Sequence, residues 1–160
     1  MNSGPFSIGL VIERLRAQVP TLQSVEGTAQ YAAITNLREF RPDSAFVLLA
    51  RERGDGEPPK AGGRQRAVVT FGVVLAVRNY RDQVGGEALD EVSPLIAQVR
   101  AALIGWTPTV NGGRPCQWLQ GDVLDYDDST LLWSDVFQTQ HFIGGAPGHE
   151  PHQHAPPNRQ

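Results

Sequence analysis

Arg64–Tyr80 reads RQRAVVTFGVVLAVRNY and is the longest apolar run of the chain. Its β-branched and aromatic residues favour an extended strand over a helix. Successive side chains of a strand point to opposite faces, and both alternating sets here are mostly apolar. The run therefore predicts a strand in the middle of a sheet, with both faces covered and helices on at least one side. Gly72 is the expected place for a bulge or bend, and the polar start Arg64–Val68 is expected to project beyond the core sheet.

A second strand, Ala45–Arg53, precedes this run and is separated from it by the polar segment GDGEPPKAGG. Two strand-like runs joined by a flexible loop predict a long β-hairpin. Arginines flank the loop on both sides, so the far end of the hairpin is expected to be polar and solvated. The loop lacks the GxxxxGK[ST] spacing of a phosphate-binding loop, so we do not assign it that function.

Two segments carry apolar residues at helical spacing. The first, Ser7–Val19, ends before Pro20 and has Ser7 as its expected N-cap. The second, Gly85–Ile104, ends at the C-cap signal Gly105, and Trp106 is expected to fold back onto the core. The apolar stripe of this second helix should face the sheet and consists of Leu89, Val92, Ile96, Val99 and Leu103.

Shorter patterns predict the remaining elements. They are a strand at Leu22–Glu26, a short helix capped by Thr28, a strand at Cys116–Gln120, a turn at Asp127–Ser129 and a strand at Thr130–Phe142. In the last strand, the better-buried face should carry Leu131, Trp133 and Phe137.

The C-terminal residues differ in kind. Gly144–Gln160 contains seven Gly or Pro in seventeen residues and no Val, Ile, Leu, Phe, Tyr or Trp, which predicts a disordered tail. The whole pattern predicts one α/β (α+β) domain over residues 1–143, followed by the tail at 144–160. We expect a mixed, mainly antiparallel sheet packed by two main helices, with a long protruding β-hairpin.

Composition excludes several classes of protein. The formal net charge of −3 gives no reason to expect specific binding of nucleic acid or of an anionic membrane. Cys116 is the only cysteine, so an internal disulfide is excluded. The chain begins without a signal-peptide pattern and has no run of about 20 apolar residues, so the simplest expectation is a soluble cytoplasmic protein without a membrane span.

Residues that could carry chemistry are few. The only acidic cluster is Asp122, Asp125, Asp127 and Asp128, with Asp125 and Asp127 on one face if the segment is extended. It lacks the EF-hand pattern, and a solvated turn between strands is the simpler interpretation. The tail histidines His149, His152 and His154 suit only adventitious metal binding, and neither Cys116 nor a serine stands in a nucleophile motif. We therefore expect no catalytic, cofactor-binding or metal-binding residue and no cofactor.

Three segments resemble the tail terminator (tail-completion) proteins of tailed bacteriophages. They are VVLAVRNY at Val73–Tyr80, LIGWTP at Leu103–Pro108 and LWSD at Leu132–Asp135, and the resemblance spans roughly Pro5–Ile143. It implies a non-enzymatic virion subunit that forms a hexameric ring, caps the head-proximal end of the tail tube and ends tube polymerisation. The implied partners are other copies of the chain, the tail tube protein, a neck or head-completion protein and, in contractile tails, the sheath protein. The implied locations are the head-proximal end of the tail and, during assembly, the host cytoplasm.

The protruding hairpin is the expected contact surface. Arginine pairs bidentately and is enriched at interfaces, so arginines on a projecting hairpin suit contacts to a neighbouring subunit or to the tube. The candidate interface residues are Arg51, Arg53, Arg64, Arg66, Arg78 and Tyr80. Three alternatives remain open: arginines that only solvate a loop, a different head–tail joining ring of the neck, and a small metalloenzyme that uses the Asp122–Asp128 carboxylates.

Overall fold

The computed structural model describes residues 3–78, 86–108 and 112–145, with the backbone alone for 86–93. Its centre is a five-stranded sheet in the order β1-β2-β3-β5-β4. β1 (Ser24–Glu26) runs parallel to β2 (Ser44–Asp55). The remaining pairs are antiparallel and join β2 to β3 (Arg64–Arg78), β3 to β5 (Thr130–Gly144), and β5 to β4 (Arg114–Tyr126). The α+β class, the hairpin and the central position of the Arg64–Tyr80 run are thus confirmed.

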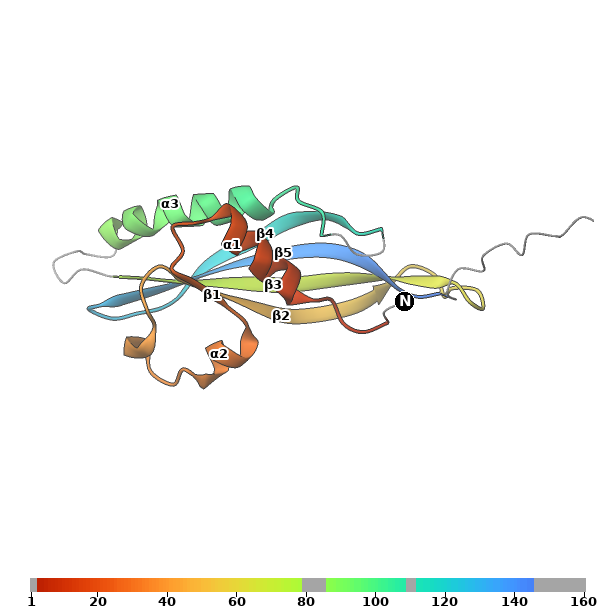
Figure 1. Cartoon of the computed structure of the whole chain (residues 1–160), viewed down its shortest axis with the longest axis horizontal. Helices are drawn as coiled ribbons and strands as arrows, with labels where there is room; N and C mark the ends of the chain where they lie inside the picture. The colour runs from red at the N-terminus through yellow and green to blue at the C-terminus, as the bar shows by residue number, and fades with distance from the viewer. Residues whose placement is uncertain (1–2, 79–85, 109–111, 146–160) are drawn as a thin grey trace, which may run out of the picture.

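Two helices form the main core with one face of the sheet (Figure 1). They are α1 (Ile8–Gln18) and α3 (Gly86–Leu103). Val11 and Leu15 of α1 and Val99 and Leu103 of α3 are completely buried against strand side chains such as Phe71. Each such burial stabilises the fold by about 1.5–3 kcal/mol, which explains why the helical stripe faces inward.

The predicted α3 stripe is confirmed in its second half. Ile96, Val99 and Leu103 are buried, and Leu95 and Ala102 beside them are buried as well, so the apolar face is wider than the stripe. The side chains of Leu89 and Val92 lie outside the described residues.

The two faces of β3 are covered to different extents. One alternating set, Ala67, Val69, Phe71, Val73, Leu75 and Val77, is buried beneath α1 and α3. On the other face, Val74 and Ala76 pack in a second, smaller core with side chains of α2 (Thr28–Ala33) and of η1 (Leu37–Glu39). Thr70 and Gly72, farther toward the hairpin, are half-buried, and Val68 beyond them is buried again, so the predicted cover on this face is interrupted in the middle of the strand.

The bulge predicted at Gly72 was wrong. Gly72 pairs in register with Leu48 on β2 and with Val136 on β5, and the irregularity lies on β2 between Leu49 and Arg51. β3 stays regular over 15 residues because β2 and β5, with 12 and 15 residues, supply hydrogen-bonding partners on both sides. For the same reason Arg64–Val68 stays within the sheet, paired with Gly144–Gln140 of β5, instead of projecting beyond it.

Element ends differ from the expectations in detail. Gly27, and not Thr28, is the N-cap of α2, and its N–H donates to the Gln30 side chain at 3.2 Å. The strand expected at Cys116–Gln120 runs instead from Arg114 to Tyr126, because its second half pairs with β5 despite its polar sequence. β5 extends to Gly144, one residue into the predicted tail. Residues 146–160, which hold the three tail histidines, lie outside the described residues.

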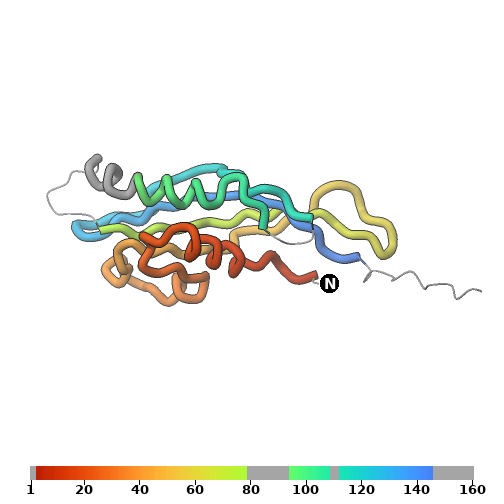
Figure 2. Tube along the Cα trace, turned by 45° about the horizontal axis from the view of Figure 1, so that its top comes forward, coloured from red at the N-terminus to blue at the C-terminus, as the bar shows by residue number. Residues whose placement is uncertain are grey.

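The molecule is elongated along the strands. The tip of the β2–β3 hairpin and the turn between β4 and β5 lie at opposite ends of the longest axis (Figures 1 and 2). Among the described helices, none is both long and apolar enough to span a bilayer.

Candidate interface surfaces

Arg51 and Arg53 lie on the accessible surface of the hairpin. Both are exposed and pair in register with Thr70 and Val68, which places them on the sheet face opposite α1 and α3. Within the described part of the chain, neither forms an ion pair. Their guanidinium groups are therefore free for contacts outside the chain.

Arg64 and Arg66 are held by contacts within the chain. The Arg64 guanidinium stacks on the Phe142 ring at 4.6 Å, and Arg66 is ion-paired with Asp55 at 3.0 Å. The Arg66–Asp55 pair is partly exposed, so it contributes only about 0–1 kcal/mol to the stability of the hairpin. These two arginines brace the hairpin between β2 and β5.

The structure separates Arg78 from the four predicted interface arginines of the hairpin. Arg78 is the exposed last residue of β3 and lies opposite Thr130, at the end of the strand far from Arg64. With a rise of about 3.3 Å per residue, the two are roughly 45 Å apart. Tyr80 lies outside the described residues.

The acidic segment is part strand and part turn. Asp127 is in the turn, where its Oδ1 accepts the backbone N–H groups of Ser129 and Thr130 at 2.7 and 2.8 Å. The bond from the Ser129 N–H is the largest cause that lowers the pKa of Asp127. The expectation that Asp125 and Asp127 share a strand face was wrong, because β4 ends at Tyr126. Instead, Asp122 and Asp125 share a face, opposite Ser134 and Leu132 of β5.

This arrangement does not assemble a metal site from described residues. No group of three or more His, Cys, Asp or Glu side chains is placed to hold an ion in the part of the chain that the structure covers. A calcium site needs about six to eight converging oxygen ligands, and two carboxylates along one strand do not supply them.

Sequence reasoning missed the most unusual surface, which lies on the edge strand β4. Among the described residues, six large apolar side chains are at least 38% exposed, and Ile104 alone of these lies outside β4. The other five, which we call the edge patch, are Trp118, Leu119, Val123, Leu124 and Tyr126. An apolar row on an exposed edge marks an interaction site or an aggregation hazard. The sequence signal was the continued presence of Val123, Leu124 and Tyr126 beyond Gln120.

β4 is irregular along its whole length. Its register against β5 shifts at three places, and at two of them Leu119 and Leu124 are the extra residues. Such bulges interrupt the outer row of backbone donors and acceptors, so the edge is poorly suited to continuous strand addition. The edge patch therefore presents side chains more than backbone.

A buried carboxylate anchors β4 to α3. Asp135 is completely buried and accepts two hydrogen bonds from Arg100, at 2.9 Å each, and one from each indole of Trp118 and Trp133, at 3.1 and 3.0 Å. The Arg100 guanidinium also lies 4.6 Å from the centre of the Trp118 ring. We call these four residues the Asp135 cluster. The hydrogen bond from Arg100 to Asp135 is the largest cause that raises the pKa of Arg100, so the guanidinium stays charged.

A second buried polar contact lies at the base of the hairpin. His141 Nε2 is 2.6 Å from Glu52 Oε1, which also accepts the backbone N–H of Phe6 at 2.8 Å. The buried Phe6 ring packs edge-on against His141 at 5.7 Å. These contacts fix the N-terminal segment to the sheet and give His141 a structural role.

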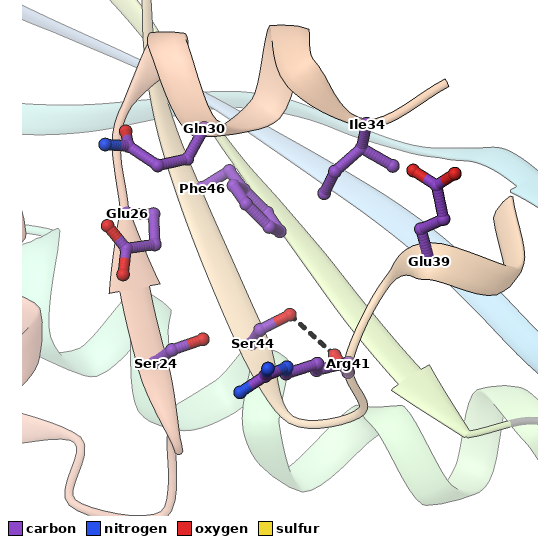
Figure 3. A pocket seen from close by; sticks show the side chains of 8 residues that line it. All are labelled: Ser24, Glu26, Gln30, Ile34, Glu39, Arg41, Ser44 and Phe46. Atoms are coloured by element: carbon purple, nitrogen blue, oxygen red, sulfur yellow. Dashed lines mark hydrogen bonds between the residues drawn. The ribbon is translucent and has the colours of Figure 1, made fainter. Parts of the chain in front are cut away.

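Two hollows flank the segment that contains α2 and η1. The first, about 330 Å³, opens beside β1 and is lined by Ser24, Glu26, Gln30, Ile34, Glu39, Arg41, Ser44 and Phe46 (Figure 3). The Ser44 hydroxyl donates to the Arg41 carbonyl at 2.6 Å, so it is held by the backbone and not activated by a base. The second hollow, about 390 Å³, lies between this segment and β4, and its lining includes Tyr31, Leu37, Phe40, Leu124 and Asp125.

Cys116 is not placed for nucleophilic chemistry. It is buried in the main core, where desolvation raises the pKa of its thiol to about 11. The thiolate, which is the reactive form, is therefore scarce at neutral pH.

Comparisons with known proteins identify the family of the chain. Among 29 matching solved chains is one from a structure titled "Virion of native gene transfer agent (GTA) particle". It shares 17% identity with this chain at a TM-score of 0.46 and covers 82% of this chain and 91% of its own length. No curated protein matches the chain in sequence. The family described as "Phage tail terminator protein" matches residues 1–147, which is nearly the whole chain. The chain therefore belongs to the phage tail terminator family and is a structural protein of the phage tail and virion.

Proposed function

We propose that the protein forms a hexameric ring on the head-proximal end of the tail tube. The ring ends tube polymerisation and offers the surface to which the neck or head-completion protein attaches. In a contractile tail, the outer rim of the ring also meets the sheath protein. This proposal rests on membership of the family together with the surface of the subunit.

The observation that carries the assembly role is the edge patch. A free subunit exposes five large apolar side chains along β4, whereas the main core buries comparable residues completely. Covering these side chains removes apolar surface from water, and each Å² buried contributes about 25 cal/mol to the stability of the complex. A partner protein therefore stabilises this surface.

The proposal is tested by deleting the gene from a phage and measuring tails by electron microscopy. Without the protein, tails should have uncontrolled lengths and should fail to join heads. A plasmid copy of the wild-type gene should restore both length and joining. Tails of normal length that fail to join heads would instead indicate a different neck ring, and normal, joined tails would refute the proposal.

A further inference from the structure

We propose that the edge strand β4 is the surface that receives the β2–β3 hairpin of a second copy of this chain. In this contact, Arg51 of one subunit pairs with Asp125 of the next, and Arg53 pairs with Asp122. The stems of the arginines pack in the hollow that Leu124 lines beside Asp125. The inference rests on the proposed ring and names the two surfaces that close it.

The first argument is charge. Residues 51–66, which form the hairpin end, contain five cationic and three acidic side chains, whereas residues 122–128 contain four aspartates and no cation. Arg51 and Arg53 are exposed, and Asp122 and Asp125 are exposed as well. Arginine and carboxylate form short bidentate pairs, so these two surfaces attract one another selectively.

The second argument is spacing. Arg51 and Arg53 lie two ladder positions apart, opposite Thr70 and Val68. Asp122 and Asp125 are also two ladder positions apart, opposite Ser134 and Leu132, because the bulge at Leu124 takes up one residue. At about 3.3 Å per residue, each pair is separated by about 7 Å. Both arginines can therefore meet a carboxylate at once.

The third argument is the hollow beside Asp125. Its volume is about 390 Å³, its lining includes the apolar side chains of Leu37, Phe40 and Leu124, and the Asp125 carboxylate belongs to the same lining. An arginine has an apolar stem and a charged planar end, which is the shape and chemistry that this hollow accepts.

The fourth argument is geometry. The hairpin and the acidic turn lie at opposite ends of the subunit (Figures 1 and 2). A contact between two different surfaces is heterologous, and it closes into a ring when the rotation between neighbours fits a whole number of copies. The bulges of β4 disfavour strand addition, so the contact is carried by side chains and does not extend the sheet without limit.

The contact is tested with cysteine pairs. In the double variant Arg51→Cys and Asp125→Cys, a short bismaleimide crosslinker should yield a ladder of dimers and higher oligomers, from purified protein or from purified particles. Buried Cys116 should not react, since its thiol is protonated. The matched control, Glu13→Cys with Asp125→Cys, places the first cysteine on the exposed side of α1 and should yield no ladder. A ladder that stops at the dimer would overturn the head-to-tail contact, as would the absence of any 51–125 crosslink in both preparations.

Charge exchange provides the second test. Reversing the hairpin (Arg51→Glu, Arg53→Glu) or the edge (Asp122→Arg, Asp125→Arg) should each weaken self-association by on the order of tenfold or more. An equal mixture of the two variants should regain assembly, because each hairpin then faces an edge of opposite charge. Circular dichroism checks that both variants are folded. A mixture that remains as weak as its parts would refute the pairing.

The two proposals fail in different ways. If the charge exchange and the crosslinks fail while the wild-type gene still restores tail length, the contact assigned here is wrong and the proposed function stands. If the crosslinked ladder forms but the deleted phage needs no complementation, the contact stands and the tail-capping function is wrong.

Discussion

Replacing Asp135 by Asn should show that the buried carboxylate holds the edge strand in place. Asp135 accepts four hydrogen bonds, two from Arg100 and one each from Trp118 and Trp133. Three of the donors bind Oδ1, and the Arg100 Nε–H alone binds Oδ2. In Asn, an NH2 group replaces one oxygen, so the Arg100 Nε–H faces a donor and the guanidinium loses its charged partner. An unsatisfied donor costs about 1–3 kcal/mol, and one partly accessible to water costs less. Since Arg100 and Trp118 are 32% and 38% exposed, we expect a loss of about 3 kcal/mol.

This loss is measured as the free energy of unfolding from urea titrations at neutral pH. For a chain of this length, it corresponds to a fall in Tm of roughly 6–12 °C. The matched control is Asp122→Asn, which changes an exposed carboxylate and should alter stability by less than about 0.5 kcal/mol. A loss below about 1 kcal/mol for Asp135→Asn would refute the view that the Asp135 cluster anchors β4.

Three further predictions concern the packing around these elements. Gly121→Ala should cost about 1–3 kcal/mol in urea unfolding, because its Cβ would lie 2.6 Å from Trp133 and 2.7 Å from Asp135 Oδ1. Gly72→Ala is the control, since its nearest contact would be an ordinary 3.8 Å, and an equal cost for both would contradict the argument. Ile96→Asp should lower the free energy of unfolding by roughly 3–5 kcal/mol, because it buries an unpaired charge. The control Ala97→Asp, on the exposed side of α3, should lower it by less than about 1 kcal/mol. A soluble, fully stable Ile96→Asp variant would disprove the packing of α3. Cys116 should resist iodoacetamide at pH 8 in native protein but react in urea. Because burial raises the pKa of the folded Cys116 thiol to about 11, the contribution of Cys116 to stability is complete below about pH 9 and is lost as the pH rises toward 11. Rapid labelling of the native protein at pH 8 would contradict the burial of Cys116.

The sequence predicted those parts of the fold in which pattern and burial coincide. Both alternating sets of side chains in Arg64–Tyr80 are mostly apolar, which predicted a strand at the sheet centre, and helical spacing placed Ile96, Val99 and Leu103 in the core. Both signals are local, and both arise because burial of one continuous face dominates the energy of folding.

The sequence did not reveal where β4 ends, because the reason is not local. Gly121–Tyr126 alternates poorly and contains two aspartates, yet it pairs with β5 since that strand offers a free edge of 15 residues. Bulges at Leu119 and Leu124 also shift which residues share a face, and single-sequence periodicity does not register such shifts. The edge patch and the Asp122–Asp125 spacing were missed for that reason.

The Asp135 cluster was missed for a different reason. Arg100 lies on α3 and Trp118 on β4, so only the packed structure brings them to Asp135 on β5. Asp135 alternates in the sequence with Trp133 and Phe137, so it lies on the same strand face. The role of a buried carboxylate, however, can be recognised only when the groups that donate hydrogen bonds to it are known.

The same cluster bears on how the proposed ring closes. A heterologous contact yields a closed ring only if each subunit repeats the same angle, and an open filament results when the angle does not close. The angle between neighbouring subunits depends on the position of β4. Three register shifts leave β4 with few regular hydrogen-bonded pairs to β5, so the strand bends easily. Asp135 limits this bending by holding Trp118 of the edge patch against Arg100 of α3. Asp135→Asn should therefore leave the two contact surfaces present but let the angle vary. Negative-stain micrographs of this variant should show open arcs and rings of mixed size. Uniform rings of wild-type size would refute the argument that ring closure depends on the anchoring of β4.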